Sequence, residues 1–230
     1  MQFNRTPVSR AALRLSLVVL GLAALRAPAQ DTAVKPPALS TGTVVRTLFD
    51  GRSFAGWEGD TNRTFRIVGA AIVAGSLHGN PRNEFLATTR AYRNFSLRFE
   101  YKLVGAEGFV NGGVQFRSTR TVRPPNEMSG YQADIGAGHS GCLYDESRRN
   151  RFLARATDAA IKRLEKPGDW NRCEIHADGP RIRLVLNGEQ TVDYTETEAG
   201  IPDTGSIALQ IHGGCKAELS FRNISLTERP

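Results

Sequence analysis

The ten residues FSLRFEYKLV (95–104) decide the fold, because their apolar side chains recur at every second position. A β-strand places successive side chains on opposite faces, so this alternation predicts a strand with one face against a core. The residues expected on that face are Phe95, Leu97, Phe99, Tyr101 and Leu103.

Other stretches alternate in the same way and are separated by Gly, Asn, Asp and Pro. They are GGVQFRS (112–118), GYQADI (130–135), WNRCEIHA (170–177), RIRLVL (181–186), SIALQIH (206–212) and AELSFRNISL (217–226). Asn187 and Gly188 separate two alternating stretches and predict a two-residue hairpin turn. This pattern predicts an all-β fold, a jelly-roll sandwich of two antiparallel sheets.

One segment, TDAAIKRLEKPG (157–168), has the composition of a short helix. Thr157 or Asp158 is expected to cap its start, and Pro167 and Gly168 to end it.

The N-terminal region resembles an export signal. Residues 1–29 contain four arginines and no acidic residue, followed by the apolar run Leu15–Leu25 and an Ala-Pro-Ala sequence before Gln30. That run is shorter than the roughly 20 residues of a membrane-spanning helix, so we expect cleavage before Gln30 rather than a permanent membrane anchor. The protein is therefore expected to be periplasmic or secreted. Residues 30–43 read as a disordered linker, and residues 44–230 as one jelly-roll domain.

Most of the excess positive charge lies in this N-terminal segment. The formal net charge is +7, and it falls to +3 without residues 1–29. Nucleic acid is therefore not an expected partner.

The chain has three cysteines, Cys142, Cys173 and Cys215. An odd number leaves at least one thiol outside any intramolecular disulfide, and the wide spacing does not match a metal-binding motif. We interpret them as small buried side chains that form at most one disulfide.

Three of the predicted strands carry polar side chains on the face opposite their apolar residues. These are Asn111, Gln115 and Arg117, then Gln132 and Asp134, and finally Gln210 and His212. If the strands are neighbours, the side chains form one polar surface, although a solvated outer face is also typical of antiparallel sheets. Asn and Gln suit sugar hydroxyls, and Tyr131, Tyr144 and Trp170 are candidates to stack on a sugar ring.

Five ordered blocks resemble the 3-keto-disaccharide hydrolases, formerly domain of unknown function 1080. The blocks are LFDGRSFAGWEG (48–59), NGGVQFRS (111–118), GYQADIG (130–136), GDWNRCEIHADGPRIRLVLNG (168–188) and IALQIHGGCKAELSFRNISL (207–226). The resemblance implies a concanavalin-like jelly roll whose concave sheet binds a sugar, and activity on glycosides oxidised to a ketone at C3. Two departures stand out: Gly112 occupies a position that is often Ser, and the acid and amide at Gln132 and Asp134 are exchanged.

The chemistry that the resemblance implies is an elimination. A ketone at C3 acidifies the C2 proton, so a base removes it, the C1 substituent leaves, and water adds to the enone. Asp134 and His212 are the candidate bases, Arg117 the candidate partner of the enolate oxygen, and Glu146 or His139 the candidate acid. The expected substrate-binding residues are Asn111, Gln115, Gln132, His139, Tyr144, Trp170 and Gln210.

Two further hypotheses remain open. A divalent metal ion held by residues among His139, Asp145, Glu146, Asp134 and His212 would stabilise an enolate, although their spacing matches no ligand motif. The same polar surface could instead belong to a lectin-like domain that binds a glycan without catalysis, because a fold alone does not determine function.

Overall fold

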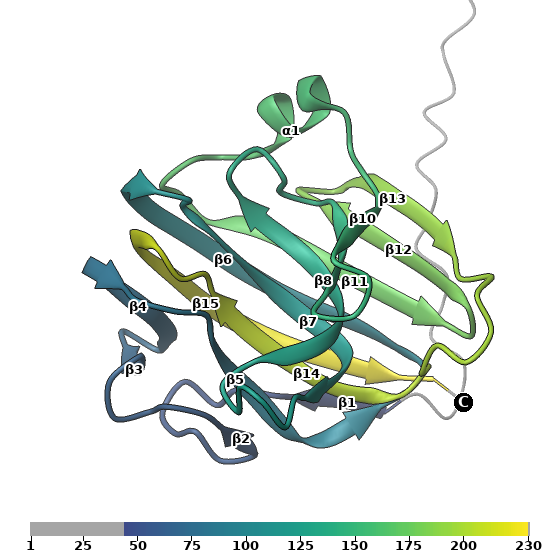
Figure 1. The fold of residues 1–230 in the computed structure, drawn as a ribbon, viewed down its shortest axis with the longest axis horizontal. Coiled ribbons are helices and arrows are strands. Elements are labelled where there is room, and N and C mark those ends of the chain that lie inside the picture. Colours follow the sequence, from purple (N-terminus) through teal and green to yellow (C-terminus); the bar gives the residue numbers. More distant parts are fainter. Residues whose placement is uncertain (1–43, 230) are drawn as a thin grey trace, which may run out of the picture. The chain divides into compact units, whose positions relative to one another are not determined.

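The computed structural model describes residues 44–229. The predicted export signal at residues 1–29 and the linker at 30–43 lie outside the described residues and stay predictions. The described chain forms two antiparallel sheets that pack face to face, as the alternation predicted (Figure 1).

The larger sheet has eight strands. Their order is β13 (Glu189–Thr195), β12 (Arg181–Leu186), β11 (Asn171–Asp178), β6 (Phe95–Gly108), β15 (Cys215–Glu228), β4 (Ala71–Asn80) and β3 (Phe65–Val68), with β1 (Val44–Thr47) paired to β15. The smaller sheet has seven strands, in the order β10 (Arg151–Ala154), β9 (Leu143–Glu146), β8 (Met128–Gly136), β7 (Asn111–Arg120), β14 (Gly205–Ile211), β5 (Glu84–Tyr92) and β2 (Trp57–Glu58).

Strand β6 confirms the prediction from its sequence. The side chains of Phe95, Leu97, Phe99 and Tyr101 are all buried between the sheets, whereas Leu103 is partly buried near the end of the core. Phe95 contacts Phe116 of the facing sheet edge to face, with ring centroids 6.3 Å apart. The two sheets are therefore joined by an apolar core to which β6 contributes a continuous row.

Two local predictions are also confirmed. Helix α1 (Asp158–Leu164) begins after Thr157, whose side chain accepts a hydrogen bond from the amide of Ala160 at 3.2 Å. Asn187 and Gly188 join β12 to β13 with φ values of 50° and 90°. Both values lie in the left-handed region that a two-residue hairpin turn requires.

All three cysteines are buried, as predicted, and each is a free thiol. The disulfide that the sequence left open is therefore not formed in this structure. In the part of the chain that the structure describes, no helix is long and apolar enough to cross a bilayer.

Candidate functional site

The three polar strand faces meet on one sheet, because β8, β7 and β14 are adjacent. In the register, Gln115 pairs with Gln132, and Gly113 pairs with both Asp134 and Gln210. Their apolar neighbours pack into the core, so the polar side chains lie together on the opposite face. We call Asn111, Gln115, Gln132, Asp134 and Gln210 the polar floor; all five are buried.

The polar floor is held together by amide hydrogen bonds. Asn111 Nδ2 and Gln132 Nε2 both donate to Asp134 Oδ1, at 3.2 and 3.1 Å, and Gln115 Nε2 donates to Gln132 Oε1 at 3.3 Å. Gly113 makes room for this arrangement, since a Cβ there would lie 2.7 Å from the Gln132 side chain. The carboxylate of Asp134 is therefore fixed in orientation by neutral donors.

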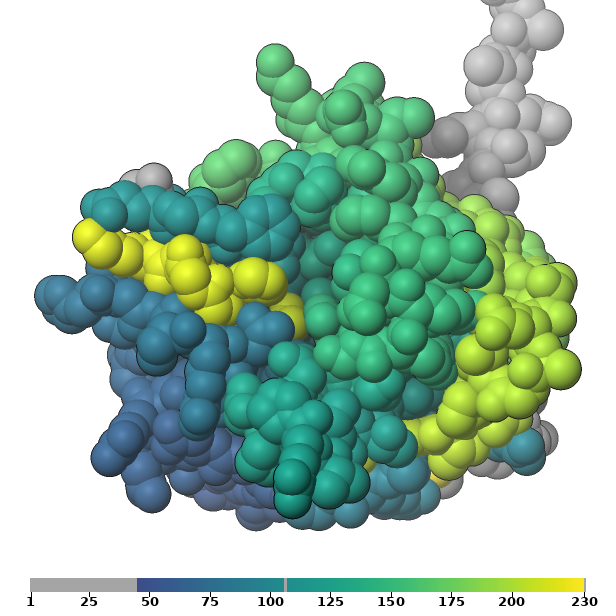
Figure 2. Space-filling model, in the orientation of Figure 1, coloured from purple at the N-terminus to yellow at the C-terminus, as the bar shows by residue number. Residues whose placement is uncertain are grey.

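A pocket of about 250 Å³ opens above the polar floor. In Figure 2 this side of the fold is hollowed between the teal and yellow strands and the green β9–β10 segment. The residues that line the pocket are Phe109, Asn111, Gln132, Asp134, His139, Tyr144, Glu146, Phe152 and His212. It thus brings together most of the predicted site residues.

Five rings form the rim of this pocket, and successive rings are in contact. They are, in order, Tyr144, Phe152, His139, Phe109 and His212, with centroids 5.0, 4.8, 6.2 and 5.0 Å apart. Apolar ring faces above a floor of amides and carboxylates match the alternating apolar and hydroxyl surfaces of a sugar.

Asp134 has an unusual protonation equilibrium for an aspartate. Burial raises its pKa from 3.8 to about 7, although the hydrogen bonds from Asn111 and Gln132 oppose the shift. Near neutral pH this carboxyl group is thus able both to accept and to release a proton.

Glu146, on β9, has a second raised pKa. Burial, followed by the negative charge of Glu127, raises its pKa to about 7, while a hydrogen bond from Gln210 opposes the shift. Gln210 Nε2 donates to Glu146 Oε2 at 3.4 Å. The side-chain oxygens of Gln115 and Gln210 are buried without a hydrogen-bond partner, and neither of these two predicted substrate-binding residues lines the pocket.

The surroundings of the two histidines of the rim affect where each ring carries its proton. His212 Nδ1 lies 2.6 Å from the carbonyl oxygen of Gly213. A carbonyl only accepts, so Nδ1 carries the proton and Nε2 of the neutral ring holds a lone pair. Burial, and then the charge of Arg155, lower the pKa of His139, which favours its neutral form.

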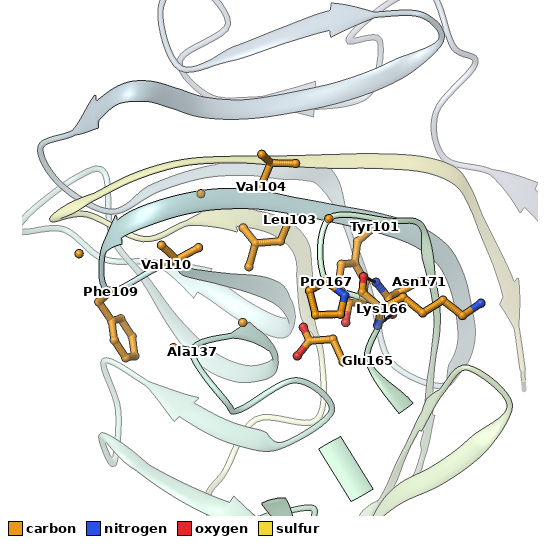
Figure 3. Close-up of a pocket in the computed structure, with 14 residues that line it drawn as sticks. Tyr101, Leu103, Val104, Phe109, Val110, Ala137, Glu165, Lys166, Pro167 and Asn171 are labelled. Atoms are coloured by element: carbon orange, nitrogen blue, oxygen red, sulfur yellow. Dashed lines mark hydrogen bonds between the residues drawn. The ribbon is translucent and has the colours of Figure 1, made fainter. Parts of the chain in front are cut away.

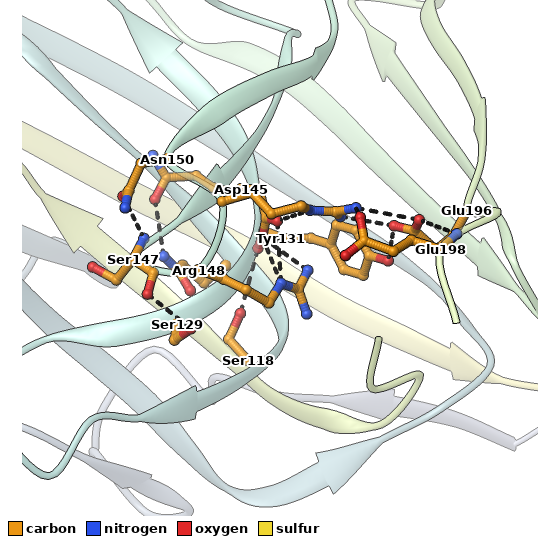
Figure 4. Close-up of polar contacts among 12 residues, drawn as sticks. Ser118, Ser129, Tyr131, Asp145, Ser147, Arg148, Asn150, Glu196 and Glu198 are labelled. Atoms are coloured by element: carbon orange, nitrogen blue, oxygen red, sulfur yellow. Dashed lines mark hydrogen bonds and ion pairs between the residues drawn. The ribbon is translucent and has the colours of Figure 1, made fainter. Parts of the chain in front are cut away.

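A charged cluster fixes the turn that follows Glu146 (Figure 4). Fully buried Asp145 accepts hydrogen bonds from Arg148 and Arg149, and Arg149 also donates to Glu196 at 2.7 Å. Tyr131 donates to the same oxygen of Glu196 at 2.7 Å, beneath the Arg148 guanidinium. We call these five residues the Asp145 cluster. It anchors the end of β9, which carries Glu146.

The prediction that Arg117 belongs to the site is wrong. A bulge in β7 interrupts the register after Phe116, and Arg117 has φ 49°. The extra residue interrupts the alternation of side chains, and Arg117 does not line the pocket. Its guanidinium donates to the carbonyl oxygens of Arg93 and Gly179, at 2.8 and 2.7 Å, so it joins two turns instead.

Two of the predicted stacking residues also lie elsewhere. Trp170 precedes β11 in the larger sheet, whereas the polar floor lies on the smaller sheet. The centre of its ring lies 3.9 Å from the guanidinium carbon of Arg222, on β15 of the larger sheet. Tyr131 is buried in the core, where it stacks on Phe116 at a centroid distance of 5.5 Å. Only Tyr144 of the three proposed aromatic residues lines the pocket.

The metal hypothesis finds no support in the arrangement of the side chains. Among residues 44–229, no three His, Cys, Asp or Glu side chains are grouped so that they could hold a metal ion. The two carboxyl groups and two histidines of the pocket are spread around it instead of converging. We therefore derive no chemical step through a metal.

With this geometry established, the chain can be compared with known proteins. Residues 45–227 match the model of the 3-keto-α-glucoside-1,2-lyase-like domain. The chain belongs to this family. The match covers nearly all of the described residues and confirms the family resemblance of the five sequence blocks.

Solved structures share the fold of this lyase-like domain at low sequence identity. A protein from Parabacteroides distasonis, provisionally named a glycosyl hydrolase, is 18% identical, with a TM-score of 0.60 over 81% of this chain and 94% of its own. The carbohydrate-binding module CBM66 from Bacillus subtilis is 15% identical, with a TM-score of 0.57 over 76% of this chain and 96% of its own.

A β-glucanase from Bacillus licheniformis is 8% identical, with a TM-score of 0.52 over 84% of this chain and 100% of its own. At these identities the similarity establishes the jelly-roll fold alone. A comparison with curated proteins gives no match.

Two pocket residues of the lyase-like domain were missed in the sequence. Phe109 precedes β7, and Phe152 lies on β10 beside the charged turn. The sequence contained one indication that Phe109 belongs to the site, since it is an aromatic residue just before the NGG block that begins a polar strand face. It contained no indication for Phe152, because the contact of Phe152 with Tyr144 depends on the pairing of β9 with β10.

Proposed function

We propose that the protein is a carbohydrate-active enzyme that cleaves 3-keto-glycosides by elimination and hydration. Membership of the family supports a glycosidase-like activity on carbohydrates. The observation that carries the finer proposal is the presence in one sugar-sized pocket of two carboxyl groups, buried Asp134 and partly buried Glu146, both with a pKa of about 7. From the N-terminal sequence we also propose that the protein is exported.

The two carboxyl groups supply an acid and a base at neutral pH. When two neighbouring groups share the same pKa, one is often ionised while the other is protonated. Asp134, held by two amide donors, is the base: its carboxylate takes the proton from C2 as the C2–H bond breaks. Glu146 is the acid: it gives a proton to the departing oxygen as the C1–O bond breaks.

The electrons of the C2–H bond pass through an enolate at the C3 oxygen and form the C1–C2 double bond. Water then adds across this bond, with its hydroxyl group at C1 and its proton at C2, so the net reaction is hydrolysis. Because Arg117 lies outside the pocket, the donors available to the enolate oxygen are the N–H groups of Asn111, Gln132 and His139. The Nε2 lone pair of His212 accepts from a sugar hydroxyl.

The decisive test gives the purified protein a 3-keto-glucoside and, separately, the unoxidised glucoside. Enone absorbance and released leaving group are followed together. Turnover of the ketone alone supports the proposal, because only the ketone makes the C2 proton acidic. Turnover of the unoxidised glucoside at an equal rate contradicts it.

A non-catalytic, lectin-like function is the second candidate. The five-ring rim and the amide groups of Asn111 and Gln132 would serve binding equally well. In that case calorimetry would show saturable binding of a glycan while neither glucoside is converted. Glu146→Gln separates the two functions further, since it removes an acid but keeps a hydrogen-bonding side chain of the same shape.

A further inference from the structure

A second pocket, of about 400 Å³, lies between the two sheets near the start of β7 (Figure 3). Its walls come from β6, from the residues before β7, from the end of β8 and from the loop after α1. The residues that the argument uses are Tyr101, Leu103, Phe109, Val110, Glu165 and Pro167. This volume is within the range of small-molecule sites.

The hydroxyl group of Tyr101 is the first sign of a ligand. Tyr101 is 1% exposed, and its hydroxyl group is buried without a hydrogen-bond partner. The nearby Ser140 accepts from the amide of Gly136 at 2.7 Å and donates to Glu165 Oε1 at 2.5 Å, and its second lone pair makes no well-formed hydrogen bond with Tyr101. An unpaired buried hydroxyl group makes folding less favourable, so a ligand that accepts from it would remove that cost.

The carboxyl group of Glu165 is the second polar feature. Burial raises its pKa, while the hydrogen bond from Ser140 opposes the shift. Only Oε1 is engaged by Ser140, which leaves Oε2 to accept from a ligand hydroxyl. A carboxyl group here disfavours anionic ligands and favours a neutral one that both donates and accepts.

The remaining walls are apolar. Leu103 and Val110 pack against the core, and Figure 3 shows Pro167 beside Glu165. Phe109 lines this pocket and also the rim of the candidate active site, so the two pockets share one wall.

We propose that this second pocket binds a neutral six-membered ring that carries a hydroxyl group. The ring contacts Leu103, Val110 and Pro167, and its oxygen accepts from Tyr101 and donates to Glu165. Two sources have this chemistry: a free phenol, or the leaving group of a glycoside whose sugar occupies the neighbouring pocket. The second source rests on the proposed function.

The first experiment measures phenol binding by ligand-observed NMR and does not depend on catalysis. Tyr101→Phe removes one oxygen and is expected to weaken phenol binding about tenfold, the value of one hydrogen bond. Tyr144→Phe removes the same atom from the rim of the first pocket and is expected to leave phenol binding unchanged. Benzene, which lacks the hydroxyl group, should bind both variants and the unaltered protein equally.

Three results would overturn the proposal: no saturable binding of phenol, equal phenol binding by Tyr101→Phe, or a loss confined to Tyr144→Phe. Urea unfolding checks the variants, and Tyr101→Phe should be at least as stable as the unaltered protein because the lost hydroxyl group has no partner. Glu165→Gln provides a second variant, which should also weaken phenol more than benzene.

A second experiment distinguishes the two sources. KM is compared for phenyl and methyl 3-keto-glucosides in the unaltered protein and in Tyr101→Phe, with 4-hydroxyphenyl 3-keto-glucoside to supply the hydroxyl group. If Tyr101→Phe raises KM for the 4-hydroxyphenyl substrate alone, the pocket is assigned to the leaving group. If Tyr101→Phe leaves KM unchanged for all three substrates, the pocket is assigned to a free phenol. If no ketone is converted at all, the proposed function fails while the phenol result still decides the pocket.

Discussion

Asp134 and Asp145 are buried aspartates on the paired strands β8 and β9, yet their surroundings are opposite. Asp134 is hydrogen-bonded by two neutral amides and faces a pocket, whereas Asp145 is enclosed by the guanidinium groups of Arg148 and Arg149. A buried carboxylate paired with cations is stable as a charge, while one without them has a raised pKa. The comparison separates a carboxyl group suited to proton transfer from one suited to holding a turn.

The largest effect should come from Asp134→Asn, which keeps the shape and loses the base. Turnover of a 3-keto-glucoside is expected to fall roughly 10²–10⁴-fold, the usual contribution of a positioned general base. Stability at neutral pH should not fall, because the amide avoids burying a charge. Steady-state kinetics measures turnover, and urea unfolding measures stability. A stable variant with unchanged turnover would remove Asp134 from the mechanism.

Asp145→Asn is expected to reduce stability and to leave turnover largely unchanged. The change leaves two largely buried guanidinium groups without their shared carboxylate, which typically costs about 3–5 kcal/mol. Urea unfolding should show this loss directly. Refolded molecules that retain the β9 turn should keep most of their turnover, since Asp145 does not line the pocket. A loss of less than about 1 kcal/mol would contradict the structural role of the Asp145 cluster.

The two pocket carboxyl groups also predict a pH dependence of stability. Their folded pKa values of about 7 lie above their ordinary values of 3.8 and 4.5. Between about pH 4 and pH 7 the folded state therefore holds protons that the unfolded state has released, so these groups make folding less favourable as pH rises.

Compared with the Asp134→Asn, Glu146→Gln double variant, the unaltered protein should lose on the order of 6 kcal/mol over this range, about half from each group, and change little above it. Urea unfolding of both proteins at pH 4 to 8 gives the difference directly. A constant difference across that range would show that neither pKa is raised.

The smallest effects compare two aromatic residues, one inside the pocket and one outside it. Phe152→Leu should raise KM for the ketone roughly three- to tenfold, because it removes one ring of the rim. Trp170→Leu should leave KM unchanged and reduce stability by about 0.5–1 kcal/mol, through its lost contact with Arg222. A larger rise in KM for Trp170→Leu than for Phe152→Leu would show that Trp170 belongs to the site.

The sequence predicted the site where local alternation continues without interruption. Gln132, Asp134 and Gln210 follow strict alternation within their strands, and the structure brings them together. The prediction for Arg117 is wrong because the bulge in β7 adds one residue, and no local pattern in NGGVQFRS indicates that insertion. Likewise, the partners of Asp145 and the contacts of Phe152 depend on pairing and turn geometry, which alternation does not encode.

The three buried free thiols have a practical consequence. Cys173 lies on β11, between β12 and β6 of the larger sheet, Cys215 begins β15, and Cys142 lies in the loop before β9. A thiol reagent reaches each of them only when the surrounding structure opens. The rates at which the three residues are labelled would therefore rank the local opening of these regions in the unmodified chain, without an introduced probe.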